Sequence, residues 1–302
     1  MYNIVLLKSP GSLNIGNEFI NAGSEYALKK ALEAAGVGDY RLFTAEFWET
    51  GNLHHKTGSS WNTKEVKSWL NRCDLIVVSA GSVNAFMREF LEDMGKFAAP
   101  TIILGAGLYQ YTQEEKELAR EVFKKAKLVV CRDHTVYETL KDVTNAQDGL
   151  DMAFFLNDAY VPPLAKGDYA VLNIDMDFKR AIARFRKYRE LKKKFKTVYV
   201  TEHNSIMYNQ NNASFVSTVR IHTSILCTLF HTPFEYLGTD CEPNAKRSML
   251  FRQIGMPLER GKQYGVEELK SRDSIISQKK EDTIQAITST VSASSTSKCT
   301  TW

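Results

Sequence analysis

The sequence lacks the features that mark secreted and metal-binding proteins. Its five cysteines form no CxxC pair, and their odd number argues against a disulfide framework. No group of cysteines and histidines has the spacing of a zinc site. We therefore expect reduced thiols, no metal and a cytoplasmic protein.

Long apolar runs and a strong excess of one charge are also missing. No stretch approaches the roughly 18 apolar residues of a membrane helix, and the first apolar run is too short for a signal peptide. The net charge of +4 over 302 residues allows an anionic ligand but makes no case for nucleic acid. The length favours about two soluble domains.

Short apolar runs alternate with longer helical patterns along the chain. Runs such as 3–8, 74–81 and 101–107 have central residues that are apolar without alternation, which is typical of parallel strands covered by helices on both faces. After a linker at 156–168, a second strand and helix series begins at 169. The sequence predicts an α/β protein with two Rossmann-like domains. We place them at 1–157 and 168–265, followed by a polar, partly disordered tail at 266–302.

Glycine-bearing loops follow several of the predicted strands. In such sheets, ligands bind beyond the carboxyl ends of the strands, where glycine lets the backbone approach closely. The loops "GSLNIGN", "SAGS" and "GAGLYQ" are neither a Walker A loop nor a GxGxxG fingerprint. They supply the candidate substrate-binding residues Asn14, Gly16, Asn17, Gly81, Ser82 and Gly105.

Charged residues stand at other strand ends. Arg132 in "CRDHT" is suited to an anion, whereas Asp133 is suited to capping a helix. Glu202 and His203 end the run 197–203, where either a substrate contact or a structural role fits. The carboxylates Asp148 and Asp151 fit acid/base work, metal binding or capping.

The segment "VRIHTS" combines an arginine and a histidine at a predicted helix start. Arg220, His222 and the first amides of that helix would favour an anion. Histidine is also the usual proton-transfer residue near neutral pH.

The segment 178–196 carries ten basic residues. Apolar residues recur in it every three or four positions, which predicts an amphipathic helix docked by one stripe. The stripe consists of Phe178, Ile182, Phe185, Tyr188, Leu191 and Phe195. Its basic face is either simply solvated or a contact surface for a membrane or an anionic glycan.

The order of these motifs carries more information than any one of them. "NIGNEFI", "DLIVVSAGS", "TIILGAG", "AKLVVCRDHTVYETL", "DGLDMAFFL", "FVSTVRIHTSILCTLFHTP" and "KRSML" follow one another over about residues 1–255. In this order and spacing the chain resembles the polysaccharide pyruvyltransferase family. The resemblance implies a glycosyltransferase-B-like fold with a cleft between two Rossmann-like halves. It also implies transfer of the pyruvyl group of phosphoenolpyruvate to sugar hydroxyls of a glycan, with release of phosphate.

The resemblance also implies roles for particular residues. Arg132 and Arg220 would hold the anionic groups of phosphoenolpyruvate, and His222 would be the general acid and base, with no metal or cofactor. Ile221 and Lys246 lie in the same motifs and are candidate substrate-binding residues.

Two departures from the family pattern keep alternatives open. Asn17 replaces an aspartate that many relatives carry, and "NIDMD" replaces a strand end that often holds an arginine. The alternatives are a glycosyltransferase that uses a nucleotide-sugar and a non-catalytic relative that binds glycans or membranes.

Overall fold

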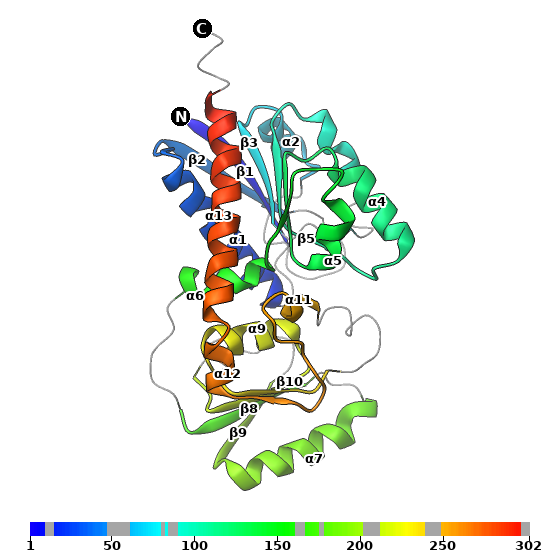
Figure 1. Cartoon of the computed structure of the whole chain (residues 1–302), viewed down its shortest axis with the longest axis vertical. Helices are drawn as coiled ribbons and strands as arrows, with labels where there is room; N and C mark the ends of the chain where they lie inside the picture. The colour runs from blue at the N-terminus through cyan, green and yellow to red at the C-terminus, as the bar shows by residue number, and fades with distance from the viewer. Residues whose placement is uncertain are drawn as a thin grey trace. The chain divides into compact units, whose positions relative to one another are not determined.

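The computed structural model describes nine stretches of the chain, and within them the chain forms two compact units (Figure 1). The stretches are 1–9, 15–46, 61–79, 82–83, 90–160, 167–174, 178–201, 212–238 and 249–296. The first unit consists of Met1–Ser12, Asn17–Phe155 and Ser277–Trp302, and the second of Leu13–Gly16 and Leu156–Ile276. Each unit therefore draws on separate segments, in place of the two consecutive domains expected from the sequence.

The first unit contains a parallel sheet. Its strands in spatial order are β2 (Tyr40–Glu46), β1 (Tyr2–Lys8), β3 (Leu75–Ser79), β5 (Thr101–Leu108), β6 (Leu128–Cys131) and β7 (Ala146–Asp148), with β4 (Ser82–Val83) paired to β5. All of these pairs are parallel. Strands β3, β5 and β6 are buried along their whole length, which confirms the parallel sheet predicted from their uninterrupted apolar residues.

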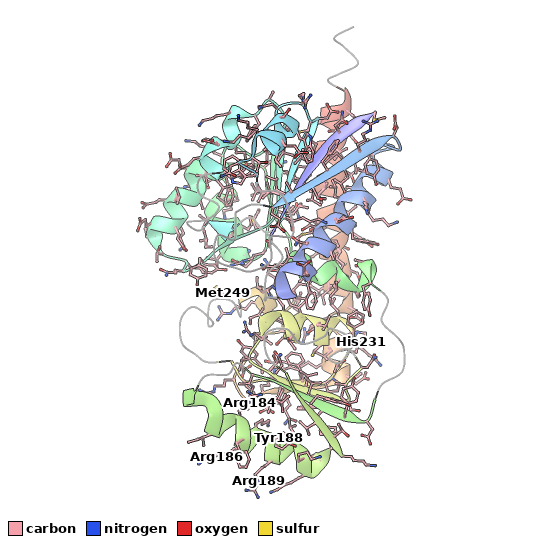
Figure 2. All side chains as sticks on the ribbon, turned by 180° about the vertical axis from the view of Figure 1, so that it is seen from behind. Arg184, Arg186, Tyr188, Arg189, His231 and Met249 are labelled. Carbon is pink, nitrogen blue, oxygen red and sulfur yellow. The ribbon has the colours of Figure 1, made fainter. Side chains whose placement is uncertain are left out.

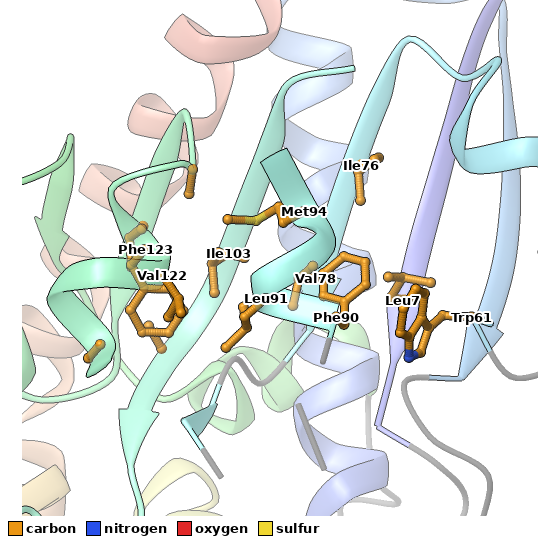
Figure 3. Packing of buried hydrophobic residues seen from close by; sticks show 14 of the residues in the cluster. Leu7, Trp61, Ile76, Val78, Phe90, Leu91, Met94, Ile103, Val122 and Phe123 are labelled. Atoms are coloured by element: carbon orange, nitrogen blue, oxygen red, sulfur yellow. The ribbon is translucent and has the colours of Figure 1, made fainter. Parts of the chain in front are cut away.

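Three helices of the first unit begin at side chains that cap them. This unit contains α1 (Ile15–Ala34), α2 (Lys64–Leu70), α4 (Gln113–Phe123) and α5 (His134–Leu140), with short 3₁₀ turns η1 (Met94–Lys96) and η2 (Met152–Phe155). Thr63, Thr112 and Asp133 each accept a hydrogen bond from the backbone N–H three residues later. The helices cover a core in which the rings of Trp61 and Phe90 pack edge to face, with 5.3 Å between their centroids (Figure 3).

The second unit contains a smaller sheet. Its strands in spatial order are β12 (Gln263–Tyr264), β11 (Phe234–Tyr236), β10 (Phe215–Thr218), β8 (Tyr169–Asn173) and β9 (Thr197–Thr201). Only β12, at one edge, is antiparallel. The helices of this unit are α6 (Leu156–Ala159), α7 (Phe178–Lys194), α9 (Ile221–Leu229), α11 (Met249–Arg252) and α12 (Val266–Lys270).

Both sheets reverse their strand order at the first strand. Strand β1 lies between β2 and β3, and β8 lies between β9 and β10. The chain thus runs to one side of the first strand and then returns to the other side. In open α/β sheets, such a switch point is where ligands bind, beyond the carboxyl ends of the strands.

Helix α7 docks on the second sheet by only part of the predicted stripe. Tyr188, Leu191 and Phe195 pack against the sheet, but Ile182 and Phe185 are 68% and 61% exposed. The single-stripe prediction is therefore wrong for these two residues. At about 100° per residue, Ile182 lies opposite Leu191, nine positions further on.

An ion pair on the inner side of α7 completes this docking. Lys187 lies 2.5 Å from Glu235 of β11, and the side chains of the two residues are 12% and 8% exposed. Ser217 of β10 donates to the same carboxylate at 3.3 Å. Burial acts to lower the pKa of Lys187, but Glu190 and Glu235 outweigh it and raise that pKa above its ordinary value.

The C-terminal segment is helical, not disordered. Residues 266–296 form α12 and the long helix α13 (Asp273–Thr296), so the predicted disorder is wrong there, and 297–302 lie outside the described residues. Ile287 and Val291 of α13 are fully buried. Its Ser and Thr side chains, such as Thr288 and Thr290, donate to carbonyls four residues earlier. This bonding satisfies hydroxyls whose abundance in the sequence suggested disorder. None of the described helices is long and apolar enough to cross a membrane.

Candidate functional site

A buried polar network lies at the switch point of the second sheet. Asn173 ends β8 and Thr218 ends β10, and Thr218 donates a hydrogen bond to the Asn173 side-chain oxygen at 2.9 Å. Thr223, in the first turn of α9, donates to the same oxygen at 3.3 Å. Since all three side chains are at most 5% exposed, these bonds are shielded from water. The network fixes how α9 leaves the sheet.

Arg220 and His222 stand at the start of α9, directly after this network. Arg220 is the N-cap residue, and its backbone N–H donates to the Thr218 hydroxyl at 2.9 Å. Ile221 opens the helix and is buried, whereas Arg220 and His222 are half-buried. A guanidinium, an imidazole and the first amides of a nine-residue helix thus lie within one turn. This combination suits an anionic ligand that also exchanges a proton.

Gly16 lies against the imidazole of His222. A methyl group on Gly16 would overlap the ring, so only glycine allows this approach. Gly16 belongs to the second unit, as His222 does, and it is the second residue of α1. Asn17 follows it in the first turn of that helix and is half-buried. The structure therefore brings two predicted site residues, Gly16 and His222, into contact.

The switch point of the first sheet carries its own buried polar network. The side-chain oxygen of Asn21 in α1 accepts from the Ser9 backbone N–H at 3.0 Å and from the Ser79 hydroxyl at 3.2 Å. Ser79 ends β3, and its hydroxyl also forms a hydrogen bond with the Ser24 hydroxyl at 2.9 Å. These bonds hold the residue after β1 and the end of β3 to α1. Asn21 and Asn173 were not predicted as site residues, because asparagines within a helix or strand have no distinctive pattern.

Arg132 lies at the carboxyl edge of the first sheet. Its Nη2 donates to the Leu108 carbonyl at 2.6 Å and approaches the Tyr111 hydroxyl at 3.4 Å. The guanidinium lies over Gly107, where a methyl group would overlap it. Nε is buried, has no hydrogen-bond partner among the described residues, and lies 3.7 Å from Asp133.

Carboxylates and a tyrosine compensate the charge of Arg132. Burial acts to lower its pKa, but Tyr111, Asp133 and Asp151 outweigh burial and raise that pKa further above its ordinary value. Tyr111 donates to Asp133 at 2.6 Å, and burial is the main cause that raises the Tyr111 pKa to about 12. Arg132 therefore stays charged and Tyr111 stays protonated near neutral pH. Because this charge is balanced within the protein, Arg132 is a weaker anion site than an uncompensated arginine would be.

The aspartates Asp133 and Asp151 act as caps. Asp133 accepts from the Val136 N–H at 3.0 Å, and Asp151 accepts from the Ala153 N–H at 2.9 Å. Asp148 instead lies 3.4 Å from both Lys279 and His134. Within the stretches that the structure describes, no group of three or more His, Cys, Asp or Glu side chains could hold a metal ion.

The other predicted site residues fall into two groups. Gly105 has φ of +70° at an irregularity of β5 and lies under Met152, so backbone conformation and packing account for this glycine. Ser82 lies in β4, in register with Gly107. Asn14, Gly81, Glu202, His203 and Lys246, and the side chain of Ser82, lie outside the described residues.

Comparison with protein families finds one match that covers most of the chain. A family model described as polysaccharide pyruvyl transferase matches residues 14–240. No curated protein matches the chain by sequence. The matched range includes Gly16, Arg132, Arg220 and His222.

Comparison with solved structures addresses the fold. A Listeria monocytogenes protein assigned as a UDP-N-acetylglucosamine 2-epimerase matches with a TM-score of 0.51 and 11% identity, over 94% of this chain and 91% of that one. The UDP-GlcNAc 2-epimerase of Methanocaldococcus jannaschii matches with a TM-score of 0.49 and 13% identity, over 91% and 92%. The match to the Listeria protein, together with the observed sheets, shows a glycosyltransferase-B-like α/β fold with parallel sheets flanked by helices, and at this identity the likeness concerns the fold alone.

Proposed function

The chain belongs to the polysaccharide pyruvyl transferase family, and we propose that it transfers the pyruvyl group of phosphoenolpyruvate to sugar hydroxyls of a glycan. Membership makes the protein a transferase that acts on a sugar or glycan. The observation that carries the finer proposal is the placement of Arg220 and His222 on the first turn of α9, at the switch point of the second sheet. A phosphate, a carboxylate and a proton-accepting carbon are the groups that such a turn suits.

The proposed reaction has two stages. Protonated His222 gives its proton to the methylene carbon of phosphoenolpyruvate, and the central carbon becomes electrophilic. A sugar hydroxyl attacks that carbon, and its proton returns to the imidazole. The carbon–oxygen bond to phosphate then breaks, the second hydroxyl of the same sugar forms the ketal, and its proton passes to the departing phosphate. In sum, phosphoenolpyruvate and a sugar diol react to give a pyruvate ketal and inorganic phosphate.

Release of phosphate from phosphoenolpyruvate, measured with a series of glycan acceptors, tests this proposal. His222→Ala should lower kcat by about 10²–10⁴-fold, the usual contribution of a general acid and base. Arg220→Ala should mainly raise KM for phosphoenolpyruvate, because it removes a donor to the anion. Ser214→Ala is the matched control, because Ser214 bonds Gly167 at the other end of β10. Turnover by His222→Ala at the wild-type rate would overturn the assignment.

Arg132 is the second arginine that we propose for the donor. Nη2 is used by the Leu108 carbonyl and Nε is buried, so the donor would meet Nη1. Arg132→Lys keeps the charge but loses the planar fork, so KM for phosphoenolpyruvate should rise about tenfold or more. A loss of stability with unchanged KM would instead assign Arg132 to holding the sheet edge.

Ligand protection separates this proposal from a nucleotide-sugar glycosyltransferase. Phosphoenolpyruvate should raise the unfolding temperature of the wild-type protein, and His222→Ala should retain part of that shift. Protection by UDP-sugars without protection by phosphoenolpyruvate would contradict the proposed donor.

A further inference from the structure

The side of helix α7 that faces away from the sheet carries both large apolar and basic side chains. We call Ile182, Phe185, Arg186, Arg189 and Lys193 the outer face of α7; all five are exposed. At about 100° per residue they share one side of the helix, opposite the buried Leu191. Arg186 and Arg189 point away from the sheet in Figure 2, whereas Tyr188 lies on the sheet side.

The charge of α7 is unlike that of the chain around it. The helix sequence FKRAIARFRKYRELKKK contains nine basic residues and one acidic residue, a surplus of eight. The whole chain has a net charge of +4, so the remainder of the chain is net acidic. The positive charge of the protein is therefore concentrated on this helix, which would orient the molecule toward an anionic surface.

The cations of the outer face are not neutralised by neighbouring carboxylates. The one acidic residue of α7, Glu190, is paired with Lys187 at 2.8 Å and with Lys194 at 3.8 Å. Among the described residues, no ion pair joins Arg186, Arg189 or Lys193 to a carboxylate. In the first unit, by contrast, Arg120 is paired with Asp142 at 2.8 Å. The outer face thus offers charge to an external partner.

The apolar side chains decide which anionic partner fits. A soluble polyanion would use the cations and leave Ile182 and Phe185 in water. A bilayer with anionic phospholipid takes both, because arginine meets the headgroups while isoleucine and phenylalanine enter the acyl boundary. We propose that the outer face of α7 binds the surface of a membrane that contains anionic phospholipid.

Co-sedimentation with vesicles tests this proposal on the full-length protein. Wild type should bind phosphatidylcholine vesicles that contain phosphatidylglycerol, should bind pure phosphatidylcholine weakly, and should lose binding as salt is raised. Arg186→Glu/Arg189→Glu should lower the partition coefficient at least about tenfold. Lys124→Glu/Lys127→Glu makes the same charge change on exposed residues of the first unit and should bind far more strongly than the α7 variant.

The apolar contribution is tested separately. Ile182→Ser/Phe185→Ser should lower the partition coefficient about tenfold, with an unchanged circular dichroism melt because both residues are exposed. Brominated phospholipid in the vesicles should quench the tryptophan fluorescence of Phe185→Trp more strongly than that of wild type. This difference would report insertion of position 185 directly.

Three results would overturn the proposal. The first is equal vesicle binding by wild type and Arg186→Glu/Arg189→Glu. The second is binding that survives Ile182→Ser/Phe185→Ser and is displaced by dextran sulfate, which would identify a polyanion site. The third is a wild-type dimer in light scattering that the serine variant converts to a monomer, which would identify contact with a second copy of the chain.

Discussion

At the scale of single residues, the contact between Gly16 and His222 makes the sharpest prediction. A methyl group on Gly16 would overlap the imidazole, so Gly16→Ala should displace the ring. Because a misplacement of about 1 Å can cost about 10²-fold in rate, kcat for phosphate release should fall by about that factor. The urea midpoint should change little, since alanine favours the helix by about 0.5–1 kcal/mol over glycine.

Gly38→Ala is the matched control for this change. Gly38 has open space where its Cβ would lie, so turnover and stability should both stay at the wild-type level. Wild-type turnover by Gly16→Ala would show that the reaction does not depend on the observed position of His222.

Some residue-level features were predictable from sequence and others were not. Asp133 directly precedes a helical pattern, so its capping role could be read locally. The contact of Gly16 with His222 joins residues far apart in the sequence, and no local pattern predicts it. The same holds for Arg132. The compensation of its charge by Tyr111 and Asp151 depends on how three separate segments pack.

At the scale of secondary-structure elements, the position of α9 depends on β8. Asn173→Ala removes the acceptor of both Thr218 and Thr223, leaving two buried hydroxyls to find other partners. We expect a loss of about 1–3 kcal/mol in the free energy of unfolding, measured by urea denaturation. We also expect kcat to fall, because Arg220 and His222 lie on the turn that these bonds hold.

Ser214→Ala controls for the loss of a side-chain hydrogen bond in the same unit. It should lower stability without a comparable fall in kcat. Equal turnover by the two variants at equal stability would contradict a positioning role for Asn173.

The buried strands are the elements that could be predicted best from the sequence. Strands β3, β5 and β6 are short, mostly apolar and rich in β-branched residues, and this length and composition favour strands over helices. Helix α7 was located correctly, but its buried side was predicted only in part, because apolar residues lie on both sides of the helix. Helix α13 was not predicted, because its abundant Ser and Thr residues suggested disorder. In the structure their hydroxyl groups bond to the backbone of the helix itself.

At the scale of the whole molecule, the last helix completes the first unit. Most of α13 belongs to that unit, with Ile287 and Val291 fully buried. Ile287→Ala should therefore cost about 2–5 kcal/mol of unfolding free energy in urea denaturation.

Ile275→Ala is the matched control on the same helix. Ile275 is 37% exposed, so its truncation should cost much less. Equal and small effects of the two substitutions would show that the C-terminal segment is dispensable, as its composition had suggested.

The buried pair of Lys187 and Glu235 has a consequence for specificity. Turning α7 about its axis by one residue would carry the Lys187 ammonium group away and leave the Glu235 carboxylate, 8% exposed, with only the Ser217 hydroxyl. Breaking a buried pair in this way costs about 3–5 kcal/mol, whereas the intact pair adds little stability over apolar residues. The pair therefore selects one rotational setting of the helix among those that its two apolar sides would permit. That setting determines which side chains of α7 the protein presents to its surroundings.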